Sequence, residues 1–147
     1  MFKHILAPTD GSKLSMKAVD QAIKLALETG AKLSLVTVVS SYPMVYAGDG
    51  YVLKPMSPKE WETSMSKHAA SHLAAAKKRA AAKNLQVNLI TVMNDEPYTG
   101  IINTAKSKKC DLIMMASHGR RGLSAMILGS ETNKVLTHST IPVLVWR

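Results

Sequence analysis

The sequence predicts an α/β fold in which one doubly wound sheet of five mainly parallel strands, in the order 3-2-1-4-5, carries helices on both faces. Short apolar segments alternate with helix-forming segments along the whole chain, which is typical of strands joined by helical crossovers. The chain has 147 residues, of which 46% are hydrophobic, so it is long enough to bury one core. Because no repeat, linker or low-complexity tract marks a boundary, we expect a single domain over residues 1–147.

The amino-terminal segment predicts a strand, a helix and a second strand. An apolar run in residues 2–10, FKHILAPTD, leads into a cluster of Pro, Asp and Gly, which indicates that the strand turns there. Residues 12–30 follow with apolar side chains at helical spacing and end in Gly30, a good left-handed helix terminator. Residues 32–39, KLSLVTVV, are rich in β-branched residues and predict the second strand. The helix positions expected to face the core are Ala18, Ala22, Ile23 and Ala26.

A long connection and a long helix come next. Residues 40–56 form a connection longer than compact domains usually contain, so we interpret it as a variable lid or a partner surface. Ser57, Pro58 and Glu60 then supply an N-cap, a first-turn proline and the acid of a capping box. The alanine-rich residues 60–84 favour a helix of about seven turns.

The remaining segments continue the alternation. Residues 86–93 predict the third strand, residues 98–109 a short helix, and residues 111–117 the fourth strand. A helix capped at Ser130 precedes the last strand, residues 141–147. The side chains of the short helix that we expect to face inward are Ile101, Ile102 and Ala105.

The last strand is a short apolar edge, IPVLVWR, with unpaired backbone groups. Such an edge is a liability that pairing with a second copy across a two-fold axis would remove. We therefore expect a homodimer through the carboxyl-terminal strand.

Two loops are expected to face each other at the point where the strand order reverses. Open α/β sheets bind ligands outside the carboxyl ends of their strands at this point. The loops are PTDGS after the first strand and SHGRRG after the fourth. The glycines of these loops and the start of the helix at Ser130 would offer backbone N–H groups to a phosphate. The alternative is a solvated turn without a ligand, which has the same amino-acid composition. Asp10 would bind a ribose or base, or a Mg²⁺ ion that bridges the phosphates.

The segments PTDGS, SHGRRGLSAMILGS and IPVLVWR together resemble the universal stress protein family over essentially the whole chain. Its ATP-binding members carry Gly, two residues, Gly, nine residues, Gly, then Ser or Thr. Gly119, Gly129 and Ser130 match this pattern, whereas Ala116 replaces its first glycine. The resemblance implies that Asp10 contacts the nucleotide and that the backbone of Val38 faces adenine. The nucleotide-binding residues expected on this basis are Pro8, Thr9, Asp10, Val38, Ala116, Ser117, His118, Gly119, Arg120, Arg121, Gly122, Gly129, Ser130 and Glu131.

Two functions remain open at this point. The first is a stress-response regulator that binds an adenine nucleotide, with ATP and Mg²⁺ as the expected ligands, and acts as a dimer. The second is a nucleotide-free dimeric interaction module that works through surface loops such as residues 40–56. Because no carboxylate besides Asp10 is placed to activate water, we expect no turnover, and at most slow ATP hydrolysis. The sequence leaves open whether ATP, AMP or a different nucleotide is preferred.

Other motifs have simpler interpretations. His68 and His72 have a metal-binding spacing, but without a third ligand we interpret them as surface histidines. The basic stretch at residues 77–83, KKRAAAK, lacks interleaved aromatic residues, so we interpret it as a solvated helix face and expect no nucleic acid. The methionines expected to fill the core are Met114, Met115 and Met126.

Ser117, His118 and Asp10 supply the residue types of a catalytic triad, but the sequence does not supply the geometry that a triad needs. We therefore assign no catalytic residue. Cys110 is the single cysteine and is expected to pack as a small apolar group.

Charge and hydropathy limit the partners. The formal net charge of +9 favours anionic partners, which include nucleotides, nucleic acids and acidic proteins. No stretch approaches the roughly 18 consecutive apolar residues of a membrane helix. With one cysteine and no recognisable signal peptide, we expect a soluble cytoplasmic protein without membrane contact.

Overall fold

The computed structural model describes residues 1–41, 56–119 and 128–147 and contains a five-stranded, all-parallel sheet in the order β3-β2-β1-β4-β5. This confirms the predicted fold class and strand order. The elements are β1 (His4–Pro8), α1 (Lys13–Thr29), β2 (Lys32–Val39), α2 (Pro58–Ala81), β3 (Val87–Met93), α3 (Pro97–Ser107), β4 (Leu112–Ala116), α4 (Ser130–His138) and β5 (Val143–Trp146).

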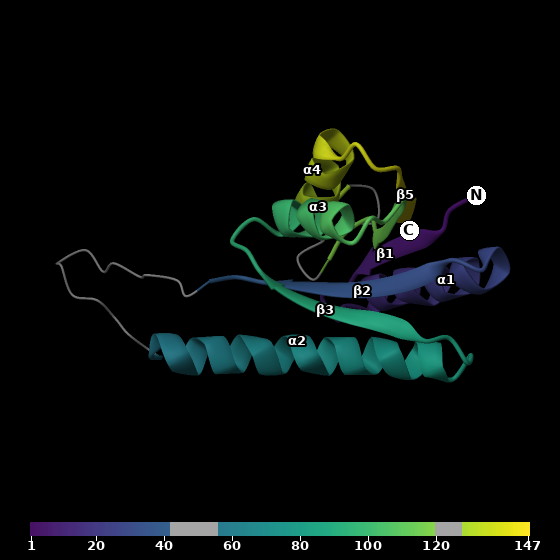
Figure 1. Cartoon of the computed structure of the whole chain (residues 1–147). Helices are drawn as coiled ribbons and strands as arrows, with labels where there is room; N and C mark the ends of the chain where they lie inside the picture. Colours follow the sequence, from purple (N-terminus) through teal and green to yellow (C-terminus); the bar gives the residue numbers. More distant parts are fainter. Residues whose placement is uncertain (42–55, 120–127) are drawn as a thin grey trace.

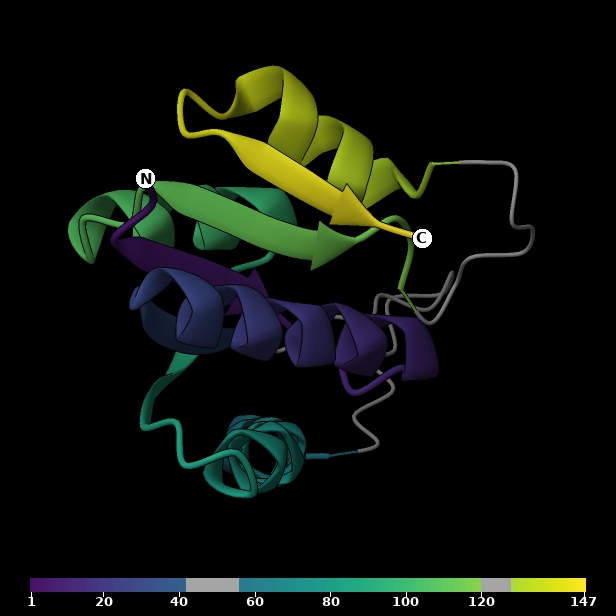
Figure 2. The ribbon, with the colours of Figure 1, turned by 90° about the vertical axis from the view of Figure 1, so that its right-hand side faces the viewer.

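Two helices cover each face of the sheet (Figures 1 and 2). Successive side chains of a strand point to opposite faces, so the central strands contribute to two separate cores. On one face, Ile5, Leu33 and Met114 pack against α1 and α2. On the other face, Leu6, Val36 and Ile113 pack against α3 and α4. The predicted inward residues of α1 and α3 are all buried: Ala18, Ala22, Ile23, Ala26, Ile101, Ile102 and Ala105.

Side chains cap the starts of α1 and α2, and only the cap of α2 was predicted from the sequence. The Ser12 side chain accepts a hydrogen bond from Ser15 N, and Ser57 and Glu60 form a complete capping box at the start of α2. Helix α4 differs from the expectation, because Gly129 occupies the N-cap position and Ser130 is the first helical residue. The predicted Ser130 cap is therefore wrong, and no side-chain hydrogen bond caps α4.

Three of the four helices lead into the next strand through a residue in the left-handed region. Gly30 has φ +68°, as its predicted role requires. Asn84 and Lys109 adopt φ +58° and +55° after α2 and α3, and nothing in the sequence singled them out. A backbone hydrogen bond closes each of these helix-to-strand turns, for example from Cys110 N to Ala105 O at 2.8 Å. A left-handed lysine is strained because its Cβ crowds the backbone.

Several expectations about single residues are confirmed. Cys110 is buried, and burial raises the pKa of its thiol to about 11. Met114 and Met115 are core residues. Met126 and most of the 40–56 connection, residues 42–55, lie outside the described residues.

Replacing Lys109 by glycine should stabilise the protein. Glycine adopts the left-handed region without a steric cost, and the expected gain is about 1 kcal/mol, which raises the melting temperature by about 2–5 °C. Calorimetry of Lys109→Gly against the parent protein measures this change. Lys108→Gly is the matched control, because Lys108 has φ −88° and should gain nothing. A higher melting temperature for both variants would contradict the assignment.

Asp111 ties the start of β1 to the start of β4. Its carboxylate accepts hydrogen bonds from Lys3 N at 2.8 Å and from His4 N at 2.9 Å. Desolvation raises the pKa of Asp111, but these two N–H donors outweigh it and hold the pKa below its ordinary value. The folded state therefore favours the charged form of Asp111. The charged carboxylate contributes fully to the folding stability at pH values above the pKa that Asp111 has in the unfolded chain.

Asp111→Asn should lower stability at pH 7 by about 1 kcal/mol, since an amide oxygen accepts these hydrogen bonds less strongly and the partly exposed site is screened by solvent. The difference from the parent should shrink as the pH falls below about 3.8, the ordinary pKa at which the unfolded chain takes up the proton, and should vanish once the pH is below the lowered pKa of the folded state. Urea unfolding at several pH values measures it. Glu62→Gln on the exposed face of α2 is the control, and an equal effect there would refute the role of Asp111.

Candidate functional site

The sheet opens between β1 and β4, where the strand order reverses. These strands pair only at Ile5 with Leu112 and at Leu6 with Ile113. Beyond this point the chain leaves β1 toward α1 on one face, and leaves β4 toward α4 on the other. The two connecting loops therefore border a common region at the carboxyl ends of the strands.

The loop after β1 is held by Thr9. Thr9 is buried, and its Oγ1 accepts a hydrogen bond from Gly11 N at 3.1 Å and is bonded to Ser15 Oγ at 3.0 Å. Its carbonyl oxygen accepts a hydrogen bond from Thr37 Oγ1 at 2.9 Å. Thr37 is a site component that sequence reasoning missed, since a threonine within a β-branched strand gives no signal. The threonines fix the backbone on which Asp10 is presented.

Asp10 follows Thr9, and its Oδ1 accepts a hydrogen bond from Ser12 N at 3.0 Å. Gly11 adopts φ +77°, and a Cβ placed on it would collide with the ring of His72 from α2. His68 is exposed as predicted, whereas the interpretation of His72 as a surface residue is wrong because it is half-buried against Gly11. The described residues contain no group of three metal-ligating side chains, whether around these histidines or elsewhere.

Strand β4 ends at Ala116 and the loop after it begins with Ser117, and both residues are buried. Ser117 N donates a hydrogen bond to Trp146 O at 2.7 Å, and Ser117 O accepts one from Gly129 N at 2.7 Å. The carbonyl oxygen of Ala116 accepts a hydrogen bond from Thr132 Oγ1 at 2.9 Å. These bonds join the end of β4 to the start of α4. Between them, Arg120, Arg121 and Gly122 lie outside the described residues.

The two loops meet at Asp10 and Gly119. A Cβ placed on Gly119 would lie 2.5 Å from Asp10 Oδ2, so the glycine permits this approach. The sequence elements that were expected to face each other across the strand reversal are thus adjacent in space.

Gly129 permits a second close approach. A Cβ placed there would lie 3.0 Å from His118 Cα and 3.1 Å from Ser117 O. A side chain at residue 129 would therefore point at the backbone of the loop itself. The effect of a larger residue would therefore be to displace the loop.

Ser117 and His118 are in contact, with 3.2 Å between Ser117 Oγ and His118 Nδ1. Ser117 is only 4% exposed, which leaves little access for a substrate to its hydroxyl. This geometry does not favour nucleophilic catalysis.

Val38 lies near the end of β2, beyond the last β1 register pair, Pro8 with Val36. Strand β2 continues alongside β3 as far as Val39. The half-buried side chain of Val38 packs against Gly100, where an added Cβ would lie 3.0 Å from Val38 Cγ1. Its backbone therefore emerges beside the loop after β1.

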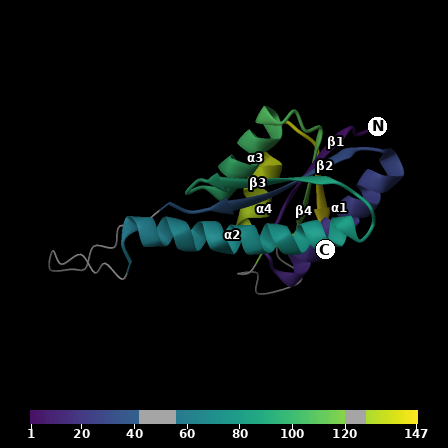
Figure 3. The same ribbon diagram turned by 60° about the horizontal axis from the view of Figure 1, so that its bottom comes forward.

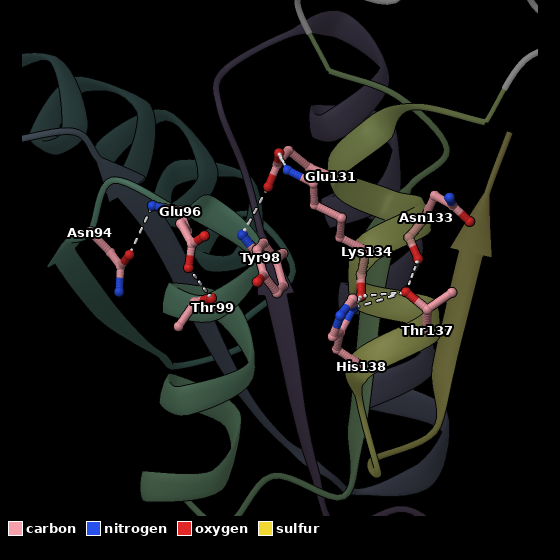
Figure 4. Close-up of polar contacts among 9 residues, drawn as sticks. All are labelled: Asn94, Glu96, Tyr98, Thr99, Glu131, Asn133, Lys134, Thr137 and His138. Atoms are coloured by element: carbon pink, nitrogen blue, oxygen red, sulfur yellow. Dashed lines mark hydrogen bonds and ion pairs between the residues drawn. The ribbon is translucent and has the colours of Figure 1, made fainter.

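Glu131 links the first turn of α4 to the first turn of α3 (Figure 4). Its Oε2 accepts a hydrogen bond from Tyr98 N at 3.0 Å, and its Oε1 forms an ion pair with Lys134 at 3.2 Å. Lys134 also lies 5.3 Å from the centre of the Tyr98 ring. Tyr98 and Lys134 thus hold the Glu131 side chain in place, and no pattern in the sequence indicated that these residues would meet. The role of Glu131 in nucleotide binding stays a prediction.

The basic stretch that begins on α2 is exposed as expected, at Lys77, Lys78 and Arg79. Arg79 also contacts α1, because it donates hydrogen bonds to Asp20 Oδ2 at 2.6 Å and to Met16 O at 3.2 Å. Among the described residues, no helix is long and apolar enough to cross a membrane.

Comparisons with known proteins agree with this architecture. Universal stress protein YxiE of Bacillus subtilis is 37% identical over 155 aligned residues that cover 100% of both chains. The structure of MJ0577 from Methanocaldococcus jannaschii matches with a TM-score of 0.81 and 26% identity, covering 99% of this chain and 95% of that one. A universal stress protein solved in complex with cAMP matches with a TM-score of 0.72 and 24% identity, covering 99% and 97%.

The model of the universal stress protein family matches residues 1–147, the full sequence. The chain belongs to the universal stress protein family.

Proposed function

We propose that the protein is a cytoplasmic stress-response regulator that binds an adenine nucleotide, ATP with Mg²⁺, between the loops after β1 and β4 and acts as a homodimer. The observation that carries the proposal is the contact of Asp10 with Gly119, because it brings together the two loops that match the nucleotide-binding pattern. A protein of the same fold has been solved with cAMP, which supports the adenine class of ligand.

The start of α4 suits a phosphate group. Gly129 brings no capping side chain, so the first N–H groups of the helix need an acceptor from elsewhere. A phosphate oxygen is such an acceptor, and the positive end of the helix dipole favours its charge. By contrast, the start of α1 in the neighbouring loop is already capped by Ser12.

Ala116 is compatible with this site. It lies in β4, in register with Trp146 of β5, and does not adopt a positive φ. An ordinary strand backbone accepts a methyl group, so the change from the family glycine does not strain the chain.

The residues proposed to contact the ligand are those expected from the sequence: Pro8, Thr9, Asp10, Val38, Ala116, Ser117, His118, Gly119, Arg120, Arg121, Gly122, Gly129, Ser130 and Glu131. When bound, Mg²⁺ would neutralise phosphate charge, and Asp10 is the side chain proposed to contact it. The protein would then bind and position the nucleotide, and we propose that it does not hydrolyse it.

Mg-ATP should raise the melting temperature of the protein. At about 100 times its dissociation constant a ligand adds roughly 2.7 kcal/mol, which corresponds to about 5–11 °C for a chain of this length. Thermal unfolding of nucleotide-stripped protein with ATP, ADP and AMP measures the shift and the preference. Ala116→Gly should preserve or enlarge the shift.

Gly119→Val should abolish that shift, because its side chain would occupy the space beside Asp10 Oδ2. Gly30→Asn is the matched control: it alters a glycine at the opposite end of α1 that has open space around it, and asparagine tolerates φ above zero. The control should keep the full shift. If no adenine nucleotide stabilises the parent protein, the nucleotide-free interaction module replaces this proposal.

The homodimer is proposed to form through β5, an edge strand of the sheet. Ile113 N bonds to Pro142 O and Ser117 N bonds to Trp146 O, so alternate residues of β5 face β4. The backbone groups of Val143 and Val145 therefore point away from the sheet. Leu144, which is 36% exposed, adds apolar surface at this edge.

Val145→Pro should weaken the dimer, because it removes an outward N–H donor and leaves the ladder with β4 intact. We expect the dimer dissociation constant to rise at least about tenfold, as measured by analytical ultracentrifugation. Val145→Thr is the control and should remain dimeric. Removal of residues 142–147 should also yield monomer or aggregate, and a well-folded dimer after that deletion would place the interface elsewhere.

A further inference from the structure

Strand β3 forms the other edge of the sheet (Figures 1 and 3), and the strand itself carries none of the residues or bulges that usually protect an edge. Its sequence, VNLITVM, contains no charge and no proline over 7 residues. Its register with β2 is unbroken from Val87 to Met93, so no bulge interrupts it. Natural proteins usually protect such edges with lysine, proline or bulges, because unprotected edges pair with other strands.

The outward hydrogen-bonding groups of β3 can be assigned from its ladder. Asn94 N donates a hydrogen bond to Val39 O, and in a parallel ladder every second residue then faces β2. Val87, Leu89, Thr91 and Met93 therefore direct their N–H and C=O groups away from the sheet. No described residue pairs with this edge in the sheet.

The side chains along the edge offer contact area on both faces. Leu89 and Met93 are 40% and 49% exposed, which is high for large apolar side chains in a strand. Toward α3, a hollow of about 370 Å³ is lined by Ser34, Asn88, Leu89, Ile90 and Lys108. In this hollow Ser34 Oγ is bonded to His4 Nε2 at 2.8 Å and accepts a hydrogen bond from Asn88 Nδ2 at 3.4 Å.

The charges at the two ends of β3 differ. Its start lies near Lys32, Lys83 and Lys108, all exposed, and the ion pairs of the described residues involve none of them. Its end is followed by Asp95 and Glu96. An acidic group on a docked strand would therefore be attracted to the start of β3 and repelled from its end.

We propose that the edge of β3 is a docking site for an extended, apolar peptide segment of a partner protein, added to the sheet as a sixth strand, with its acidic residues against Lys83 and Lys108. The backbone edge would give affinity, Leu89 and Met93 would contact apolar side chains, and the lysines would select acidic ends. A nucleic acid is disfavoured because it cannot pair with a strand edge. This site lies apart from the proposed nucleotide site and does not depend on it.

Two synthetic heptapeptides serve as probes, one with Asp-Glu followed by alternating Val and Thr, and one with the same pattern reversed. They allow parallel and antiparallel addition. Titration into the full-length protein, followed by amide NMR shifts and calorimetry, should show saturable binding with shifts at Leu89, Thr91 and Met93. No saturation up to about 1 mM, an affinity at the weak limit for specific binding, would overturn the proposal.

Thr91→Pro removes one outward N–H and should weaken binding by at least about fivefold, whereas Thr91→Val should bind as the parent does. A second test leaves the protein unchanged, so that misfolding of a variant cannot explain the result. The heptapeptide that binds is made in two forms, each N-methylated at one of its two sets of alternate residues. Methylation of the residues that face β3 should abolish binding, and methylation of the residues that face away from β3 should not. Equal binding of both methylated peptides would overturn the proposal.

The double variant Lys83→Glu/Lys108→Glu should weaken peptide binding at least about tenfold at low salt. The control Lys17→Glu/Lys24→Glu makes an equal charge change at exposed positions of α1 and should have little effect.

Two further results would contradict the peptide proposal. One is a self-association that Thr91→Pro abolishes without peptide, which would identify a second copy as the occupant. The other is tighter binding of an oligo-dT strand that depends on Lys83 and Lys108 and displaces the peptide.

Discussion

The parallel pairing of β1 with β4 is the constraint on which the rest of this structure depends. Parallel strands require crossover connections, and here the crossovers from these two strands run to opposite faces of the sheet. Their loops consequently lie next to each other with no strand between them. Asp111 reinforces the pair at its other end, where its carboxylate accepts hydrogen bonds from the N–H groups of Lys3 and His4 at the start of β1. The position of the proposed ligand site follows from this topology before any side-chain chemistry is considered.

Close approaches at glycines then shape the loops. Gly11 accommodates His72, Gly119 accommodates Asp10, and Gly129 accommodates the backbone of Ser117 and His118. In each case a Cβ would meet atoms from another segment of the chain, so these glycines serve tertiary contacts as well as backbone freedom. The family spacing of Gly119 and Gly129 has a physical meaning in this light. One glycine brings the two loops together, and the other closes the second loop onto the end of β4.

The two edges of the sheet present different surfaces. At β5 the strand is short, and Trp146 packs partly into the core, so only a narrow apolar edge is available. At β3 the edge is longer, its register is complete, and lysines gather at one end. In a doubly wound fold every connection from a helix to a strand returns to the same end of the sheet, which explains why Lys32, Lys83 and Lys108 are neighbours despite their separation in sequence. The proposed ligand site and the two edges of the sheet thus lie at separate places on this domain.

The sequence by itself determined the strand and helix order, the inward faces of α1 and α3, the capping box at Ser57 and the two loops that meet where the strand order reverses. These features depend on local periodicity, capping chemistry and the topological rules of parallel sheets, all of which are written in short segments. Tertiary structure alone decided the half-buried position of His72, the link from Glu131 to Tyr98, and the left-handed conformations of Asn84 and Lys109. Each of these depends on a neighbour brought close by the fold, or on a turn that packing imposes against local preference, and neither cause leaves a pattern in the sequence.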